Sequence, residues 1–448
     1  MKIERNKNMS SYVTRKTPGD TEWFVHDRFG MFIHFGLYAM PARHEWIKSM
    51  EKIPDSKYDL YFKHFNPDLL DAKDWARQAK EAGMKYAVLT TKHHEGFCLF
   101  DTKYTDYNVM NTPYGKDIVR EYVEAFRAEG LKVGFYYSLL DWHHPDYTLD
   151  HCNPRRDDEN WKTYDEGRDM HRYAKYMRDQ VTELLTNYGT IDILWFDFSW
   201  QGDPEFEKTH PGIRGGKGKD DWEAEELIAL ARKLQPGIII DNRTGIEQDI
   251  FTPEQYQMQQ WVKHPETGEL VNWEACQTFS GSWGYFRDEM SWKTPDMLIN
   301  MLVRTVSLGG NLLMNVGPTS RGYFDSRAQD ALKVYGEWMK YNGRAIYGCT
   351  MAEPEFKVPN GCFATQSVDG KRLYVHLVEY PYAFLELRGF AGKVEYAQFL
   401  HDGSEILFTE GKSEHISESR TEAPDLLVLT IPQIRPKMLT PVIELFLK

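Results

Sequence analysis

The segment DAKDWARQAKEAGMKYAVLTT (71–91) contains one full unit of the pattern that decides the fold. Its first part, Asp71–Ala82, has a helical pattern and is followed by Gly83, a residue suited to the position just after a helix. Its last part, Tyr86–Thr91, is a short apolar run, as expected for a parallel strand buried on both faces. A helix that leads into such a strand indicates an α/β fold.

The same unit recurs between about Trp23 and about Tyr347. Further strand-like runs are Gly30–Phe35, Lys132–Ser138, Ile191–Phe198, Gly237–Asp241 and Asn311–Val316. The helical patterns between them are Asp117–Glu129, Ala174–Tyr188, Glu223–Leu234 and Asp296–Leu308. This many repeats over about 320 residues favours a (β/α)8-like (TIM-type) barrel over a doubly wound sheet. No GxGxxG motif follows the first strand, so a dinucleotide-binding fold has no support.

The pattern changes after Tyr347, where short alternating strands are separated by Gly and Pro turns. The strands expected there are Arg372–Val378, Phe384–Leu387, Val394–Leu400 and Leu426–Ile431. Such a pattern is typical of a β-sandwich. We therefore predict a catalytic (β/α) barrel over residues 1–348 and a C-terminal β-sandwich over residues 349–448, since 448 residues exceed one usual core.

The amino-acid composition limits the classes of molecule that the protein is expected to bind. The net charge of -13 argues against nucleic acid, because phosphate recognition needs a basic surface. No apolar run is long enough to span a membrane, so we expect no membrane partner. Aromatic residues make up 14% of the chain, which suits the stacking of sugar rings, although large barrel cores also contain many aromatic side chains. A neutral ligand such as a sugar fits these figures.

The five cysteines are scattered and contain no CxxC pair, so they form neither a disulfide framework nor a zinc cluster. This distribution suits a reducing compartment. The N-terminus lacks the apolar core of a signal peptide. We therefore expect a cytoplasmic protein from the sequence as written, or a periplasmic or secreted one if a signal has been removed. The sequence leaves a homo-oligomer open.

Polar side chains gather at the ends of the predicted strands, where a (β/α) barrel places its active site. The polar and aromatic residues at or just after these ends are His34, Lys92, His93, His94, Glu95, Tyr136, Tyr137, Ser138, Trp195, Asp197, Asp241, Asn242 and Arg243. A purely structural barrel would not need costly polar groups at every strand end. Asp197 closes the apolar run ILWF, so its carboxylate is either functional or paired in a structural salt bridge with a strand-end Arg or His.

The adjacent histidines His93 and His94 raise the alternative of a metal site. On a regular strand they would point to opposite faces, so they converge only if the backbone leaves the pleat. No HxH, HExxH or cysteine ligand accompanies them, which favours hydrogen bonding to substrate hydroxyls over zinc. Glu45 and Trp46 follow the first strand and offer a carboxylate beside a ring, as a sugar site needs, although a plain surface loop explains them equally well.

With these residues collected, the chain resembles the α-L-fucosidases of glycoside hydrolase family 29. The segments that carry the resemblance are RFGMFIHFG (28–36), HEW (44–46), TTKHHEGFCLFDT (90–102), KVGFYYSLLDWH (132–143), ILWFDF (193–198), DNR (241–243), WEACQTFSGSWGY (273–285) and LGGNLLMNVGP (308–318). They fall in order across nearly the whole predicted barrel, and the segment after residue 350 adds little.

The resemblance implies a retaining exo-α-L-fucosidase that needs no cofactor and no metal and acts on a fucosylated oligosaccharide or glycoconjugate. Asp197 would be the nucleophile, with Arg243 helping to hold it ionised. Glu254 aligns best with the acid/base position, Glu274 is the alternative, and Asp241 and Glu247 come further behind. The residues that would line the fucose pocket are His34, Glu45, Trp46, His93, His94, Tyr137, Trp195, Arg243 and Trp283.

One departure from the family pattern is Phe196, where some relatives carry a polar residue beside the nucleophile. Two other functions remain as alternatives at this level. The first is a metal-assisted barrel hydrolase that uses His34, His93 and His94, and the second is a non-catalytic fucose-binding relative. The preferred linkage depends on the loops that shape the leaving-group side, so the sequence does not determine it.

Overall fold

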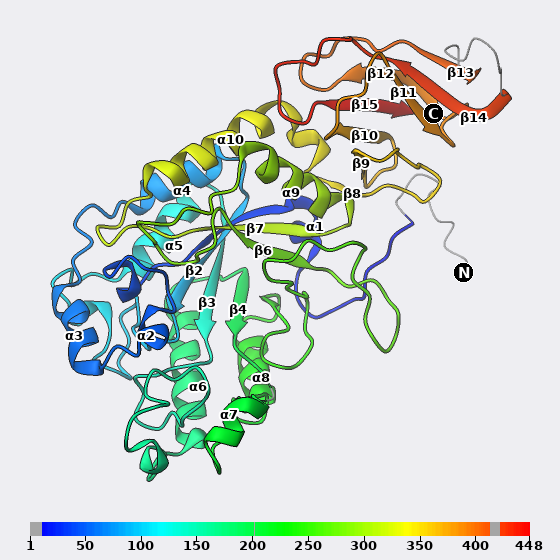
Figure 1. Cartoon of the computed structure of the whole chain (residues 1–448). Helices are drawn as coiled ribbons and strands as arrows, with labels where there is room; N and C mark the ends of the chain where they lie inside the picture. Colours follow the sequence, from blue (N-terminus) through cyan, green and yellow to red (C-terminus); the bar gives the residue numbers. More distant parts are fainter. Residues whose placement is uncertain (1–10, 201, 413–421) are drawn as a thin grey trace.

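The computed structural model describes residues 11–200, 202–412 and 422–448, and its main feature is a parallel sheet (Figure 1). The order of its strands is β5-β4-β3-β2-β1-β7-β6. Their bounds are β1 (Phe29–Ile33), β2 (Tyr86–Lys92), β3 (Lys132–Ser138), β4 (Ile193–Asp197), β5 (Ile239–Ile240), β6 (Glu274–Thr278) and β7 (Asn311–Val316). Except for Lys132 at the start of β3, every residue of these strands is buried, which explains their nearly continuous apolar sequences.

The gap between the two outer strands, β5 and β6, is bridged by residues 250–254. Ile250 forms a parallel bridge with Asp241, just after β5. Phe251 then pairs with Trp273, and Glu254 pairs with Cys276 of β6. The segment therefore acts as an eighth strand, which completes the predicted barrel. Its position also brings Glu254 to the C-terminal end of the strands.

Helices surround the sheet on its outer face, as the predicted βα repeats require (Figure 1). The longer ones are α3 (Asp55–His64), α4 (Ala72–Glu81), α5 (Ile118–Ala128), α6 (Met170–Asn187), α8 (Ala224–Leu234), α9 (Pro295–Ser307) and α10 (Ser326–Asn342). The shorter ones are α1 (Glu22–Asp27), α2 (Ile47–Met50) and α7 (Pro204–Thr209). Asp71 caps α4 by accepting hydrogen bonds from Lys73 N and Asp74 N, and Gly83 follows the helix with a φ of +86°.

Alternate residues of each strand contribute to two separate apolar clusters. Phe32, Tyr136 and Trp195 belong to the cluster inside the barrel. Tyr137 and Phe196, their immediate neighbours, belong to the cluster between the sheet and the helices. This alternation follows from strand geometry, in which successive side chains point to opposite faces. It decides which strand-end residues can reach the open end of the barrel.

The chain after α10 forms two antiparallel sheets with their own apolar cluster. One sheet has the order β12-β15-β10-β9-β8 and the other β11-β14-β13. Their bounds are β8 (Cys349–Met351), β9 (Cys362–Ser367), β10 (Arg372–Leu377), β11 (Phe384–Arg388), β12 (Val394–Phe399), β13 (Phe408–Lys412), β14 (Glu422–Thr430) and β15 (Val442–Leu447). These sheets confirm the predicted β-sandwich. Among the described residues, no helix is both long and apolar enough to cross a membrane.

Candidate active site

A cavity of about 340 Å³, including the open space at its mouth, lies at the C-terminal ends of the barrel strands. Polar and aromatic side chains form its wall in roughly equal numbers. The lining residues are Phe32, His34, Glu45, Trp46, His93, Tyr136, Trp195, Asp197, Phe198, Glu254, Cys276 and Trp283. Apolar surface with a few placed polar groups is typical of a small-ligand site.

Asp197 ends β4 at the wall of this cavity and is only 9% exposed. Its Oδ1 accepts hydrogen bonds from Nη1 of Arg243 at 2.8 Å and from the backbone N–H of Phe198 at 3.0 Å. Its Oδ2 accepts a hydrogen bond from the hydroxyl of Tyr136 at 2.9 Å. Burial raises the pKa of Asp197 above the usual aspartate value, whereas Arg243 favours its ionised form. The carboxylate is thus both paired and held in one orientation.

Glu254 lies beside Asp197 because one guanidinium group holds both. Nη1 of Arg243 donates to Oε2 of Glu254 at 2.7 Å and to Oδ1 of Asp197 at 2.8 Å. Two oxygens bound to one nitrogen at these distances lie at most about 5.5 Å apart, a limit that fits the carboxyl spacing of retaining glycosidases and is shorter than that of inverting ones. The Glu254 side chain is 43% exposed, so it faces the open mouth of the cavity.

Arg243 is itself fixed from three sides. Its Nε donates to the hydroxyl of Thr252 at 3.0 Å, and its Nη2 donates to the carbonyl of Thr252 at 3.0 Å. The guanidinium carbon lies 4.7 Å from the centre of the Trp195 ring, in a cation–π contact. Arg243 therefore acts as a rigid link between the two carboxyl groups.

A second set of polar groups faces the cavity as hydrogen-bonding partners. His34 bonds through Nδ1 to Oδ1 of Asn315 at 2.6 Å, and burial lowers its pKa to about 3. Glu45 accepts hydrogen bonds from the N–H groups of Trp283 at 3.1 Å and Gly284 at 2.8 Å. Burial raises the pKa of Glu45 to about 7. These groups suit the recognition of hydroxyls, which donate and accept without a net charge.

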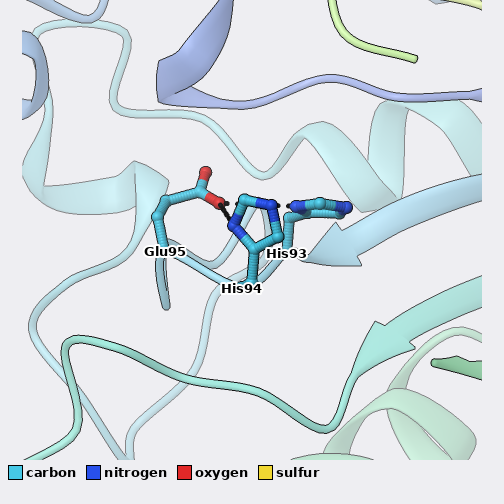
Figure 2. A group of neighbouring side chains, drawn as sticks. All are labelled: His93, His94 and Glu95. Atoms are coloured by element: carbon cyan, nitrogen blue, oxygen red, sulfur yellow. Dashed lines mark ion pairs between the residues drawn. The ribbon is translucent and has the colours of Figure 1, made fainter. Parts of the chain in front are cut away.

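His93 and His94 lie side by side after β2, with ring centroids 4.0 Å apart (Figure 2). The pairing of β2 with β3 is irregular between Thr90 and Lys92, so the backbone has left the regular pleat before the histidines. This is the condition under which we expected the two rings to converge. His93 lines the cavity, whereas His94 packs behind it, between the rings of Trp46 and Trp142 at 4.5 and 4.2 Å.

Within the described residues, His93, His94 and Glu95 form one group whose ligand atoms, all within 4.8 Å of one another, could hold a metal ion. This group differs from the predicted alternative, in which His34 was the third ligand. Nδ1 of His34 is already bonded to Asn315. The three side chains equally suit a hydrogen-bonded cluster, since each carries donors or acceptors in a buried position.

Several predicted site residues lie away from the cavity. Tyr137 points to the outer face of β3, where its hydroxyl donates to Oε1 of Gln180 at 2.8 Å. Its prediction as a pocket residue is wrong, because strand alternation brings Tyr136 to the inner face instead. Glu274 is fully buried inside the barrel, where it accepts hydrogen bonds from the Tyr86 hydroxyl and, at 3.2 Å, from Nε1 of Trp195.

The two remaining candidates for the acid/base role are also outside the cavity lining. Asp241 is fully buried and accepts a hydrogen bond from the backbone N–H of Phe196 at 3.2 Å. Glu247 forms ion pairs with His264 at 2.7 Å and with Arg15 at 3.9 Å. Glu254 is thus the one candidate acid/base carboxyl that lines the cavity with Asp197.

Some residues that form the site were not among the predicted pocket residues. These are Phe32, Tyr136, Phe198 and Cys276 in the cavity lining, and Asn315 behind His34. Strand alternation from His34 would have indicated Phe32 as an inward-facing residue, whereas the inward direction of Tyr136 follows only from its register with Trp195 on the next strand. Phe198 has a φ of +80°, which no local sequence signal indicates, because glycine or asparagine normally occupies this conformation.

Comparisons with known proteins agree with this geometry. The family model described as Alpha-L-fucosidase matches residues 2–344. The plasma alpha-L-fucosidase of Homo sapiens is 31% identical over 359 residues, which cover 72% of this chain and 68% of the relative. Alpha-L-fucosidase isoenzyme 1 from Paenibacillus thiaminolyticus has 45% identity and a TM-score of 0.86, covering 96% of this chain and 98% of its own.

A further solved structure bears on the reaction. It is a family 29 alpha-L-fucosidase from Bacteroides thetaiotaomicron, described as a trapped covalent intermediate in complex with 2-fluoro-fucosyl fluoride. Its identity to this chain is 29% and its TM-score is 0.79, with 98% of this chain and 99% of that chain covered.

Proposed function

The chain belongs to the α-L-fucosidase family and is a retaining α-L-fucosidase, and we propose that Asp197 is its nucleophile and Glu254 its acid/base. The observation that carries this assignment is the shared contact with Arg243, whose Nη1 bonds to both carboxyl groups. The substrate we propose is a terminal α-L-fucose on an oligosaccharide or glycoconjugate.

In the first step, Asp197 Oδ2 or Oδ1 attacks the anomeric carbon and forms an ester bond as the glycosidic bond breaks. Glu254 gives its proton to the departing oxygen, so the leaving sugar departs as an alcohol. In the second step, Glu254 takes a proton from water, whose oxygen attacks the same carbon and releases Asp197. Two inversions return the α configuration.

Arg243 supports both steps from one position. In the free enzyme its Nη1 donates to both carboxyl groups and so holds them side by side. Once Asp197 has become an ester and has lost its charge, Arg243 remains beside Glu254.

The rest of the cavity supports recognition of a deoxysugar. His34, Glu45 and His93 offer hydrogen bonds to hydroxyl groups, and burial keeps both imidazole rings neutral by lowering their pKa. Phe32 and Trp283 supply apolar surface for the C–H faces of the ring and for the C6 methyl group. This mixture of hydrogen-bonding groups and aromatic rings suits fucose.

Azide rescue tests the two assignments separately. Asp197→Ala should lose hydrolysis of an aryl α-L-fucoside, Glu254→Ala should hydrolyse it slowly because the covalent intermediate lacks a general base, and azide should restore turnover in each. Azide replaces the nucleophile in Asp197→Ala, so the product should be β-fucosyl azide. In Glu254→Ala it attacks the covalent intermediate, so the product should be α-fucosyl azide. The opposite anomers, or near-full activity of Asp197→Ala without azide, would reject the assignment.

A further inference from the structure

Glu95 is a buried carboxyl group that the reaction described above does not use. It is 1% exposed, and neither of its oxygens has a hydrogen-bond partner among the described residues. Burying a carboxyl group without partners costs free energy, so its place directly behind the cavity requires an explanation. Glu95 lies beside the imidazole rings of His93 and His94.

The Oε2 oxygen of Glu95 faces the Nδ1 nitrogen of His93 and also the Nδ1 nitrogen of His94 (Figure 2). It lies 3.8 Å from Nδ1 of His93 and 3.7 Å from Nδ1 of His94. The turn after β2 makes this possible, since the N–H of Gly96 bonds to the carbonyl of His93 and Gly96 has a φ of +85°. Both Nδ1 atoms are buried and lack a partner in the part of the chain that the structure describes.

The buried surroundings of His93, His94 and Glu95 favour the neutral form of each side chain. Burial lowers the pKa of His93 and of His94 well below the usual value, so each ring carries a single N–H. Burial also raises the pKa of Glu95 to about 8, although Lys48 and Lys92 oppose this shift. The other titratable groups that sense the Glu95 charge are Asp141, Tyr38, Tyr58 and Tyr107. Oε2 can accept a hydrogen bond whether or not Oε1 carries a proton.

We propose that Glu95 is a positioning residue whose Oε2 accepts hydrogen bonds from the Nδ1–H groups of His93 and His94 and thereby fixes their tautomer. A shift of about 0.8 Å would bring each pair to an ordinary N–H···O distance. The proton on Nδ1 leaves Nε2 of His93 with a lone pair, because a neutral imidazole carries one hydrogen. His93 lines the cavity, so its Nε2 then accepts a hydrogen bond from a sugar hydroxyl.

This inference rests on the proposed function, in which His93 binds a sugar hydroxyl. The first test compares Glu95→Gln, which keeps an acceptor oxygen, with Glu95→Leu, which removes it at similar size. On 4-nitrophenyl α-L-fucoside, Glu95→Gln should stay within about threefold of the wild-type kcat/KM. Glu95→Leu should raise KM by about tenfold or more with a smaller change in kcat, because His93 is no longer held in the tautomer that accepts the sugar hydroxyl throughout the reaction.

Thermal unfolding separates this effect from loss of structure. Glu95→Leu should unfold at a somewhat lower temperature than the wild type, because two buried imidazole N–H groups lose their acceptor, but it should remain folded at the temperature of the activity assay. Wild-type KM in Glu95→Leu would overturn the proposal, and so would equal damage in both variants. Loss of wild-type activity on dialysis against a chelator, regained with zinc, would also overturn it, since the three side chains would then bind an ion.

A spectroscopic measurement needs no variant of Glu95. In wild-type protein with 15N-labelled histidine, the ring nitrogen shifts of His93 should show a protonated Nδ1 and a bare Nε2, with the signals assigned from spectra of His93→Asn and His94→Asn. A bare Nδ1 in His93 would overturn the proposal. Hydrolysis by the wild type and its loss in Asp197→Ala test the proposed function independently, so the two can fail separately.

Discussion

The hydroxyl of Tyr136 donates a hydrogen bond to Oδ2 of Asp197 at 2.9 Å from the neighbouring strand. A hydrogen bond to a charged group contributes about 1.5–3 kcal/mol. Tyr136→Phe should therefore lower kcat/KM on an aryl fucoside by about 10- to 100-fold, because it removes a contact that orients the nucleophile. Tyr137→Phe is the matched control, since its hydroxyl points to Gln180. A larger loss in Tyr137→Phe than in Tyr136→Phe would contradict the placement of these side chains.

Replacing Glu254 by Gln should produce a loss that depends on the leaving group. An acid is needed most when the departing alcohol is a poor leaving group. For Glu254→Gln, kcat/KM should fall by more than about 100-fold on a fucosyl disaccharide, but much less on a nitrophenyl or dinitrophenyl fucoside. Glu274→Gln should alter all substrates by a similar factor, because Glu274 lies inside the barrel. A leaving-group dependence in Glu274→Gln alone would transfer the acid role to that residue.

Arg243→Lys should be severely impaired although it keeps the positive charge. The guanidinium donates from Nε and Nη2 to Thr252 while its Nη1 contacts both carboxylates. A lysine ammonium has no planar fork and cannot make this set of contacts. We expect a loss in kcat/KM of about 100-fold or more, measured on an aryl fucoside at several pH values. Retention of wild-type kcat/KM would show that a point charge is sufficient.

Glu274 should make stability depend on pH in a definite direction. Burial raises its pKa to about 7 from the ordinary glutamate value of 4.5. The folded state then binds more protons than the unfolded state between these values, so the contribution of Glu274 to stability is full below about pH 4.5 and is lost as pH rises toward 7. At 1.36 kcal/mol per unit, the loss approaches about 3 kcal/mol.

The measurement compares wild type with Glu274→Gln by thermal or denaturant unfolding at pH 5 and pH 7. The glutamine variant cannot ionise, so its stability relative to the wild type should improve at the higher pH. The constant offset from altered hydrogen bonds to Tyr86 and Trp195 cancels in this comparison. A stability difference that is the same at both pH values would contradict the prediction.

The barrel could be predicted from the sequence because most of its strands are buried on both faces and so are continuously apolar. Two parts of the barrel were not predicted from the sequence. The strand β6, with the sequence EACQT, is fully buried yet polar, because Glu274 bonds to Tyr86 and Trp195 inside the barrel. Residues 250–254 pair with the neighbouring strands only through isolated bridges. Their extended conformation therefore depends on those neighbouring strands and not on a local sequence pattern.

The burial of the strands on both faces also limited the prediction of which residues form the site. A strand that is apolar on both faces has no alternation, so the sequence of β3 did not tell which of Tyr136 and Tyr137 points inward. Asp197 and His34 could be assigned because strand ends of a barrel converge. Glu254 was found through the family resemblance alone, since no local pattern indicates that Arg243 brings it to Asp197.

The most direct test of the central assignment is to identify the residue that becomes covalently attached to the sugar. The wild-type enzyme would be treated with 2-fluoro-fucosyl fluoride, which forms the glycosyl-enzyme but slows its hydrolysis, and then digested and sequenced by mass spectrometry. We expect one 2-fluoro-fucosyl adduct, on Asp197 in the peptide that contains ILWFDF (193–198), and no adduct on Asp197→Ala. An adduct on Glu254, Glu274 or Asp241 of the wild type would contradict it.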